Sequence, residues 1–236
     1  MTWFCKKHKL PSLCKTMRDI LQIVFPLILH MNSKSRPLKT FNLLLIFFIL
    51  FFQICNAQNK TYKDSIIAYQ QNYTNTHEVV SKADRKYIHF YDIDESCRVN
   101  ASFERIKDKK GFDMNTSSGM KKHYFIYGLL TFKLHDSLLH LYVYQSEILM
   151  RQKKYKDYLF VPFGDATSGF ESYGGGRYLE FFIPDIKNNY VRLDFNKAYN
   201  PYCAYTTGYN CPIPPKENLL TVPIAAGEKN YEKPFH

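Results

Sequence analysis

The sequence predicts a mainly β protein, in which an antiparallel sandwich or barrel follows an N-terminal helical arm. From about residue 86 onward, short segments rich in β-branched and aromatic residues show partial alternation of polar and apolar positions. Clusters of Gly, Asn, Asp and Pro separate these segments, as turns do in sandwiches and barrels. The roughly 180 residues that follow the leader suit one domain with a single core. We therefore expect one β-rich domain over residues 86–236.

The helical arm is expected over residues 58–85, with its helix over residues 61–73. Asp64 and Ser65 lie near the start of this helix, and no Gly or Pro interrupts it. Ile66, Ile67 and Tyr73 can share one helical face.

The strands are inferred from β-branched and aromatic segments between turn residues. They are expected over residues 86–93, 98–106, 124–134, 138–148, 158–163, 177–183, 190–195 and 218–224. His135, Asp136 and Ser137 form a short polar break between two of these segments. Residues 124–148 are therefore expected to form a β-hairpin.

The N-terminus has the pattern of an export signal. Basic residues at Lys34, Arg36 and Lys39 precede an apolar run over residues 41–55, and the small residue Ala57 follows it. This pattern is typical of a cleaved signal peptide over residues 31–57, with the mature chain starting at Gln58. The alternative is a retained membrane anchor, although about 20 apolar residues are needed to span a bilayer. Residues 1–30 precede Met31 and are interpreted as a misassigned gene start or an extension. The expected location is extracytoplasmic, in the periplasm or secreted, or else membrane-anchored.

The basic charge of the chain belongs mostly to this leader. The whole chain has a net charge of +11, but residues 1–57 hold eight of its 32 Lys and Arg residues and one of its 21 acids. The remainder has 24 basic and 20 acidic residues, a net charge of +4. This balance disfavours a nucleic-acid partner. Contact with a membrane is expected only through the N-terminal apolar segment.

The cysteines agree with export. The mature part contains Cys97, Cys203 and Cys211, and an oxidising compartment permits a disulfide between the last two. Cys97 is then expected to be a buried, small apolar residue. An alternative makes Cys203 a nucleophile beside a histidine from another strand, for which the candidates are His89, His123, His135 and His140. The sequence shows no metal-ligand spacing or cofactor motif, so neither a metal nor a cofactor is expected.

Charged residues embedded in apolar strands suggest either of two arrangements. In the first, Arg177 pairs with Asp194 or Glu228 in an internal salt-bridge network. In the second, several acids and Arg177 converge on a pocket for a polar ligand. The candidate pocket residues are Asp165, Thr167, Arg177, Asp194, Asn196, Asn200 and Glu228. Residues 174–176, three consecutive glycines before Arg177, favour a tight turn over an anion-binding loop.

A second candidate feature is the aromatic loop "NPYCAYTTGYNCPIPP" over residues 200–215. Its tyrosines, together with Tyr199, offer an apolar face and a polar tip, which suits stacking on a sugar ring or a flat ligand. Alternatively, they cover one end of the barrel.

Several C-terminal motifs carry a family resemblance. The words "PFGDATSG", "YGGGRYL", "LDFNKAYNPYCAY", "CPIPPKEN" and "AGEK" occur in this order. Over residues 62–229 the chain resembles a bacterial and archaeal family, domain of unknown function 1684. The resemblance implies a shared fold and assigns no catalytic residue.

These observations lead to two functional hypotheses. The first is an exported binding or structural module with a polar pocket for a small ligand of unidentified class. The alternative is an extracytoplasmic hydrolase-type enzyme that uses carboxylates of the same cluster as general acid or base. Two carboxyls facing one open cleft would favour the enzyme, whereas carboxyls enclosed around Arg177 would exclude it.

Overall fold

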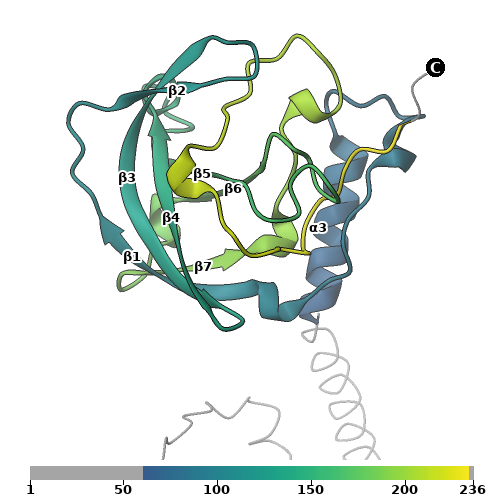
Figure 1. Cartoon of the computed structure of the whole chain (residues 1–236), viewed down its shortest axis with the longest axis horizontal. Coiled ribbons are helices and arrows are strands. Elements are labelled where there is room, and N and C mark those ends of the chain that lie inside the picture. Colours follow the sequence, from purple (N-terminus) through teal and green to yellow (C-terminus); the bar gives the residue numbers. More distant parts are fainter. Residues whose placement is uncertain (1–60, 234–236) are drawn as a thin grey trace, which may run out of the picture. The chain divides into compact units, whose positions relative to one another are not determined.

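Seven antiparallel strands form one sheet that curls almost into a barrel, as the computed structural model shows for residues 61–233 (Figure 1). The strand order is β6-β5-β4-β3-β1-β7, and β2 pairs separately with β3. The strands are β1 (Arg98–Arg105), β2 (Phe112–Asn115), β3 (Lys121–Leu134), β4 (Ser137–Ser146), β5 (Tyr158–Phe163), β6 (Arg177–Phe182) and β7 (Tyr190–Asp194). The predicted mainly β class is confirmed.

Two α-helices occur between residues 61 and 233: α3 (Tyr62–Thr76) and the short α4 (Glu147–Met150). Helix α3 begins with a capping box, in which Thr61 Oγ1 accepts from the backbone N–H of Asp64 and the Asp64 carboxylate accepts from that of Thr61. Short 3₁₀ helices lie at Arg85–Tyr87, Glu95–Cys97, Ile183–Asp185, Phe195–Lys197, Tyr202–Ala204 and Lys216–Asn218.

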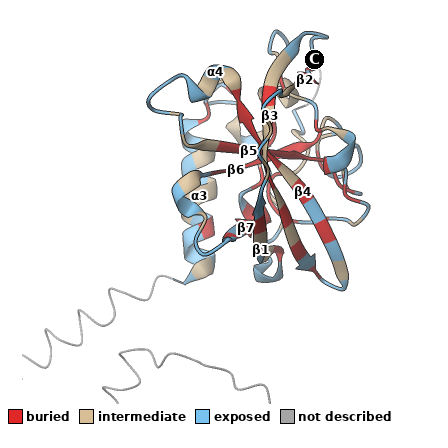
Figure 2. Ribbon diagram, turned by 90° about the vertical axis from the view of Figure 1, so that its left-hand side faces the viewer, coloured by how far each residue is buried: buried red, intermediate tan, exposed pale blue. Residues whose placement is uncertain are grey.

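Helix α3 is held mainly by tyrosine hydroxyls, since Ile66 is its only buried residue (Figure 2). The Tyr62 hydroxyl donates to Asp194 at 2.9 Å, and the Tyr69 hydroxyl donates to the backbone carbonyl of Lys197 at 3.0 Å. These bonds fix the helix beside the segment that follows β7.

The β3–β4 hairpin forms as predicted. Leu134 pairs with Ser137, so the turn contains only His135 and Asp136, and His135 adopts a positive φ of 51°. A bulge interrupts the register between Ile126 and Gly128. A Cβ atom at Gly128 would lie 2.4 Å from the ring of Phe103 on β1, so only glycine lets these strands approach.

Both faces of the sheet carry apolar or aromatic side chains where α3 and the C-terminal loops cover it. Alternate residues of β5, Leu159, Val161 and Phe163, enter the main core inside the curled sheet. The other face contributes a second cluster, made of Met114, Tyr124, Tyr144, Phe160 and Tyr178. Strand β5 is therefore buried on both faces, which explains its nearly continuous apolar sequence.

Two expected strands are wrong. Residues 86–93 contain part of the 3₁₀ helix Arg85–Tyr87 and a single bridge from Phe90 to Glu228. Residues 218–224 follow the 3₁₀ helix Lys216–Asn218 and make one parallel bridge, from Leu219 to Gly164. Strand β2 was not predicted from the sequence. The other six expected strands are confirmed, with ends that shift by up to three residues.

Asn218 explains why its segment is not a strand. Strands β4 and β5 pair at one position only, Tyr144 with Phe160. The Asn218 side chain bridges the rest of the gap: it accepts from the N–H of Tyr142 at 2.7 Å and donates to the carbonyls of Tyr142 and Pro162. A buried side chain thus replaces part of the ladder.

The predicted leader, including the signal over residues 31–57 and its apolar run, lies outside the described residues. No helix between residues 61 and 233 is both long and apolar enough to cross a membrane.

Candidate functional site

The charged residues singled out in the sequence form enclosed networks. Arg177 has no exposed surface, and its Nη2 donates to Asp165 Oδ2 and to the carbonyl of Ile224, both at 2.8 Å. Its Nη1 donates to the carbonyls of Ala226 and Glu228. Strand β6 is thereby fastened to residues 224–228. This arrangement matches the salt-bridge interpretation, with Asp165 as the partner in place of Asp194 or the Glu228 carboxylate.

Asp165 is satisfied from its other side as well. Its Oδ1 accepts from the N–H and the hydroxyl of Thr167, at 2.8 and 2.7 Å, and from the N–H of Ile224 at 3.1 Å. The carboxylate is therefore fully engaged in holding the loop before β6.

The three glycines form the turn that precedes Arg177. Gly176 has a φ of +81°, and its N–H donates to the carbonyl of Tyr173. A Cβ atom there would lie 2.6 Å from Pro214 and 2.7 Å from the carbonyl oxygen of Phe163. The close approach explains the glycine at the last of these positions.

Asp194 and Asn196 form a separate group that anchors the start of α3. Asn196 Nδ2 donates to the Tyr62 hydroxyl at 2.9 Å and to the Asp94 carbonyl at 2.7 Å. Asp194 Oδ1 accepts from the Tyr62 hydroxyl. These contacts give both side chains a structural role.

Glu228 is fully buried beneath tyrosines. Its carboxylate accepts from the hydroxyls of Tyr205 at 2.5 Å and Tyr73 at 3.1 Å, and from the N–H of Asn200 at 2.9 Å. Burial raises the pKa of Glu228 from 4.5 to about 7, against the opposing effect of these hydrogen bonds and of Arg177.

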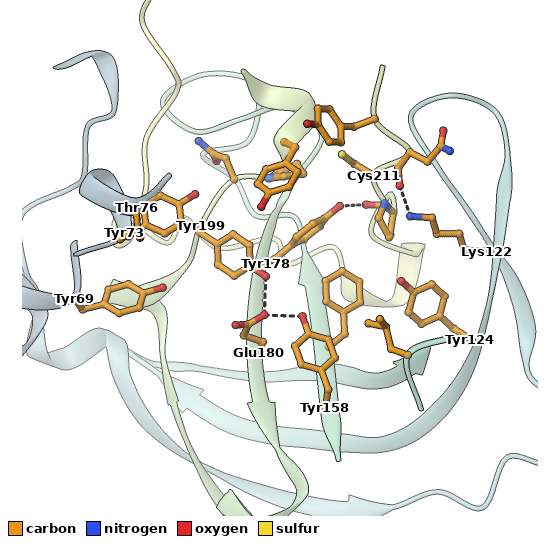
Figure 3. A pocket seen from close by; sticks show the side chains of 18 of the residues that line it. Tyr69, Tyr73, Thr76, Lys122, Tyr124, Tyr158, Tyr178, Glu180, Tyr199 and Cys211 are labelled. Atoms are coloured by element: carbon orange, nitrogen blue, oxygen red, sulfur yellow. Dashed lines mark hydrogen bonds between the residues drawn. The ribbon is translucent and has the colours of Figure 1, made fainter. Parts of the chain in front are cut away.

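An open pocket of about 580 Å³ lies elsewhere, against the second face of the sheet (Figure 3). Strands β3, β5 and β6 supply its floor, and α3 and the loop after β7 supply its walls. The lining residues are Tyr69, Asn72, Tyr73, Thr76, Lys122, Tyr124, Leu149, Tyr158, Phe160, Tyr178, Glu180, Tyr199, Asn200, Pro201, Tyr202, Tyr209, Asn210, Cys211 and Pro212. Eight of the chain's 19 tyrosines are among them, which makes the pocket unusually aromatic.

The rings form a continuous wall. Neighbouring ring centroids lie 4.7–6.5 Å apart, within the range of edge-to-face and stacked pairs. The series runs Tyr69, Tyr73, Tyr199, Tyr178, Phe160, Tyr124. Such a wall offers flat apolar surface along much of the pocket.

Glu180 contributes a carboxylate to this wall. Its Oε2 accepts from the hydroxyls of Tyr158 at 2.6 Å and Tyr199 at 2.9 Å, as Figure 3 shows. Burial, followed by the charge of Glu180, raises the pKa of Tyr158 well above its ordinary value. For Tyr199, burial again leads, and the neighbouring Tyr158 and Glu180 add to the rise in pKa. Both phenols therefore remain neutral donors at physiological pH.

The ammonium group of Lys122 lies at another part of the pocket, across Tyr178 from Glu180 in Figure 3. Lys122 Nζ donates to the carbonyl of Asn210 at 2.6 Å, and burial lowers the pKa of this ammonium. The Tyr178 hydroxyl donates to the carbonyl of Pro212 at 2.5 Å. These bonds tie the loop after β7 to the sheet.

The predicted disulfide between Cys203 and Cys211 is present and closes that loop. Ser117 fastens the loop to the end of β2: its N–H donates to the Cys211 carbonyl, and its hydroxyl accepts from the Cys211 N–H. Because its sulfur is bonded to Cys211, Cys203 does not act as a nucleophile in this form. Cys97 is buried as expected, and burial raises its pKa to about 11.

Of the seven candidate pocket residues, only Asn200 lines this pocket; the other six lie in the networks described above. The Asn200 side chain is 1% exposed, and its Oδ1 has no hydrogen-bond partner among residues 61–233. Three of the loop tyrosines, Tyr199, Tyr202 and Tyr209, line the pocket. Tyr205 instead bonds Glu228.

Glu180 and the floor tyrosines were not predicted from the sequence, although their spacing carries part of the signal. Tyr158 and Phe160 are two residues apart in β5, as are Tyr178 and Glu180 in β6. Residues two apart in a strand share a face, so the spacing puts Tyr158 with Phe160 and Tyr178 with Glu180. The register of β5 with β6, in which Phe160 lies opposite Glu180, brings both pairs to one side of the sheet. No group of three or more His, Cys, Asp or Glu residues within residues 61–233 could hold a metal ion.

The comparisons agree with the family resemblance of the C-terminal motifs. Residues 84–229 match the family described as "Protein of unknown function (DUF1684)". The solution NMR structure of an uncharacterized protein of Haloarcula marismortui is similar, with a TM-score of 0.55 and 29% identity, over 71% of this chain and 94% of that one. No curated protein matches the chain. Since the family match spans more than half of the sequence, the chain belongs to the DUF1684 family of proteins of unknown function.

Proposed function

We propose that the mature domain is exported and binds a small polar ligand in the tyrosine pocket. The observation that carries this proposal is the pocket itself: about 580 Å³, open, and lined by eight tyrosines with one carboxylate and one ammonium group. Small-molecule sites typically measure roughly 300–1,000 Å³ and combine aromatic walls with a few polar groups.

The export part of the proposal is supported by the leader pattern and by the disulfide. Disulfides persist in oxidising compartments, and the Cys203–Cys211 bridge lies in a wall of the pocket. Retention of residues 41–55 as a membrane anchor is the alternative within the same proposal. A net charge of +4 outside the leader gives nucleic acid no support as a partner.

The hydrolase alternative finds less support in the geometry. Asp165 is enclosed against Arg177, and Glu228 is enclosed beneath Tyr73 and Tyr205. Glu180 is the one carboxylate that lines the pocket within residues 61–233. The acid and base of such an enzyme would be two carboxyls that face the same cleft. The candidate cluster does not form such a pair.

Blocking the pocket from α3 tests the proposal. Asn72 is exposed and lines the pocket, whereas its neighbour Gln71 is exposed and does not. We expect Asn72→Trp to abolish ligand binding and the matched control Gln71→Trp to leave it intact. Saturation-transfer NMR with a panel of glucose, N-acetylglucosamine, glycine betaine, choline, putrescine and malate provides the measurement. Absence of binding across the panel, or equal binding by both variants, would contradict the proposal.

A further inference from the structure

The carboxylate of Glu180 has no positive partner. It forms no ion pair and no hydrogen bond at Oε1 within the part of the chain that the structure describes, and its Oε2 is occupied only by the phenols of Tyr158 and Tyr199. The side chain is exposed, so Oε1 remains available to a ligand. In contrast, the buried Asp165 is fully satisfied by Arg177 and Thr167.

The rings beside Glu180 are equally without a cation. Elsewhere in residues 61–233, Lys or Arg lies over several rings, as Arg98 does over Tyr62 and Arg105 does over Tyr127. Among the pocket rings, only Tyr69 has such a contact, with Lys197 at 5.6 Å. No Lys or Arg of the described chain lies over Tyr158, Tyr178 or Tyr199.

The local field at this end of the pocket is negative. Burial is the main cause of the raised pKa values of four phenols here, and the negative charge of Glu180 adds to each rise. These phenols belong to Tyr69, Tyr158, Tyr199 and Tyr202. Glu228, which is only partly ionised at neutral pH because its pKa is raised to about 7, accepts from the Tyr73 hydroxyl behind that ring. The pocket's one basic residue among those described, Lys122, is instead bonded to Asn210.

From this arrangement we infer that the pocket recognises an organic cation, whose ammonium group is held between Glu180 and the rings of Tyr158, Tyr178 and Tyr199. Aromatic faces attract ammonium groups, most strongly when the cation is alkylated and partly desolvated. A carboxylate next to those faces adds a direct ionic contact. A neutral ligand of the same shape would forgo both contributions. This inference rests on the proposed function and names the chemical class of its ligand.

Two pairs of matched compounds test the inference. Choline is compared with its uncharged isostere 3,3-dimethylbutan-1-ol, and putrescine with butane-1,4-diol, by calorimetric titration of the folded protein. We expect at least one cation to bind about tenfold or more tightly than its neutral counterpart. Raising the salt concentration should weaken binding of the cation and leave binding of the neutral compound unchanged.

The variant Glu180→Gln should abolish this preference. The glutamine carbonyl still accepts from Tyr158 and Tyr199, so the wall is retained while the charge is removed. Glu104→Gln is the matched control, since Glu104 is an exposed strand residue on β1 outside the pocket. Circular dichroism melting curves verify that both variants are folded.

The outcomes separate this inference from the proposed function. The inference is supported if Glu180→Gln loses the preference for the cation and Glu104→Gln retains it. Equal binding of cation and neutral isostere, or binding of only a sugar or malate, overturns it and leaves the pocket as a binding site. Failure of every compound to bind contradicts both.

Discussion

The interior of this domain contains a fully buried ion pair between Arg177 and Asp165. Arg177 and Asp165 are both fully enclosed, and backbone carbonyls take the remaining donors of the guanidinium except Nε. A buried ion pair contributes little beyond its desolvation cost, but removal of one partner leaves an uncompensated charge. The pair therefore matters for holding residues 224–228 against β6 more than for any reaction.

Arg177→Met is expected to destabilise the domain strongly. It leaves the Asp165 carboxylate buried without its partner and frees three backbone carbonyls, so the free energy of unfolding should fall by about 3–5 kcal/mol. Urea unfolding provides the measurement. Arg192→Met on the exposed side of β7 is the control and should change stability by less than about 0.5 kcal/mol.

Recovery of stability in a double variant would confirm the cause. Asp165→Asn in the Arg177→Met protein removes the unpaired charge and should restore part of the loss. A stable Arg177→Met protein that had lost ligand binding would instead favour a role of Arg177 in the pocket.

Glu228 should make stability depend on pH. Because its folded pKa is about 7 and its ordinary value is 4.5, the folded protein binds more protons than the unfolded chain between these values. The contribution of Glu228 to stability is therefore full below pH 4.5 and is lost as pH rises to about 7.

Glu228→Gln removes this titration. We expect the difference in unfolding free energy between wild type and variant to change by about 3 kcal/mol between pH 4.5 and 7.5, in the direction that favours the variant at high pH. Urea unfolding at several pH values tests this. Parallel pH profiles for the two proteins would show that Glu228 keeps its ordinary pKa in the folded state, and would contradict this prediction.

Most strand positions were predictable because short stretches of sequence determine them. Strands β1 and β3–β7 were predictable because their alternation and turns lie within short stretches of sequence. Residues 86–93 and 218–224 show the same composition, but each segment makes only a single bridge, and the Asn218 side chain bonds β4 and β5 in place of a ladder. Composition alone does not distinguish these cases.

The pocket was less predictable for a related reason. Its wall depends on which residues of β3, β5 and β6 stand beside one another, and on how α3 and the loop after β7 cover them. Glu180 meets Tyr199 only because residue 199 pairs with Tyr178 at the edge of β6. Such pairing across distant segments is set by the tertiary fold. The enclosed Arg177 network was foreseen as one alternative because charge in an apolar strand requires a partner.

The disulfide should hold the loop that forms one wall of the pocket. Closing a loop of this size contributes about 2–3 kcal/mol in the chain-entropy model. Reduction should lower the unfolding free energy by about that amount and weaken ligand binding. Urea unfolding with and without reductant provides the measurement. In the double variant Cys203→Ser/Cys211→Ser, reductant should no longer change the unfolding free energy. In the control Cys97→Ala, reductant should lower it as in wild type. A wild-type protein indifferent to reductant would contradict this role.

The curled sheet buries one face in the main core, and part of its other face forms the floor of the pocket. Helix α3 and the disulfide-closed loop complete the walls, so residues far apart in sequence meet at one site (Figures 1 and 3). Tyrosine suits these positions because its ring contributes apolar surface while its hydroxyl bonds a carboxylate or a carbonyl. Among the described residues, the fold thus forms a pocket with a single lining carboxylate in place of the pair of facing carboxyls that a hydrolase would require.

The binding function of the tyrosine pocket is best tested by native and denaturing mass spectrometry of the protein, exported with its own leader and purified without added ligand. We expect a polypeptide starting at Gln58 with one disulfide, and additional small-molecule mass in the native spectrum alone. That additional mass should be retained in Gln71→Trp and absent in Asn72→Trp. Ligand mass that persists in Asn72→Trp, or a native protein that carries no ligand and takes up none of the panel compounds, would contradict a binding function for the tyrosine pocket.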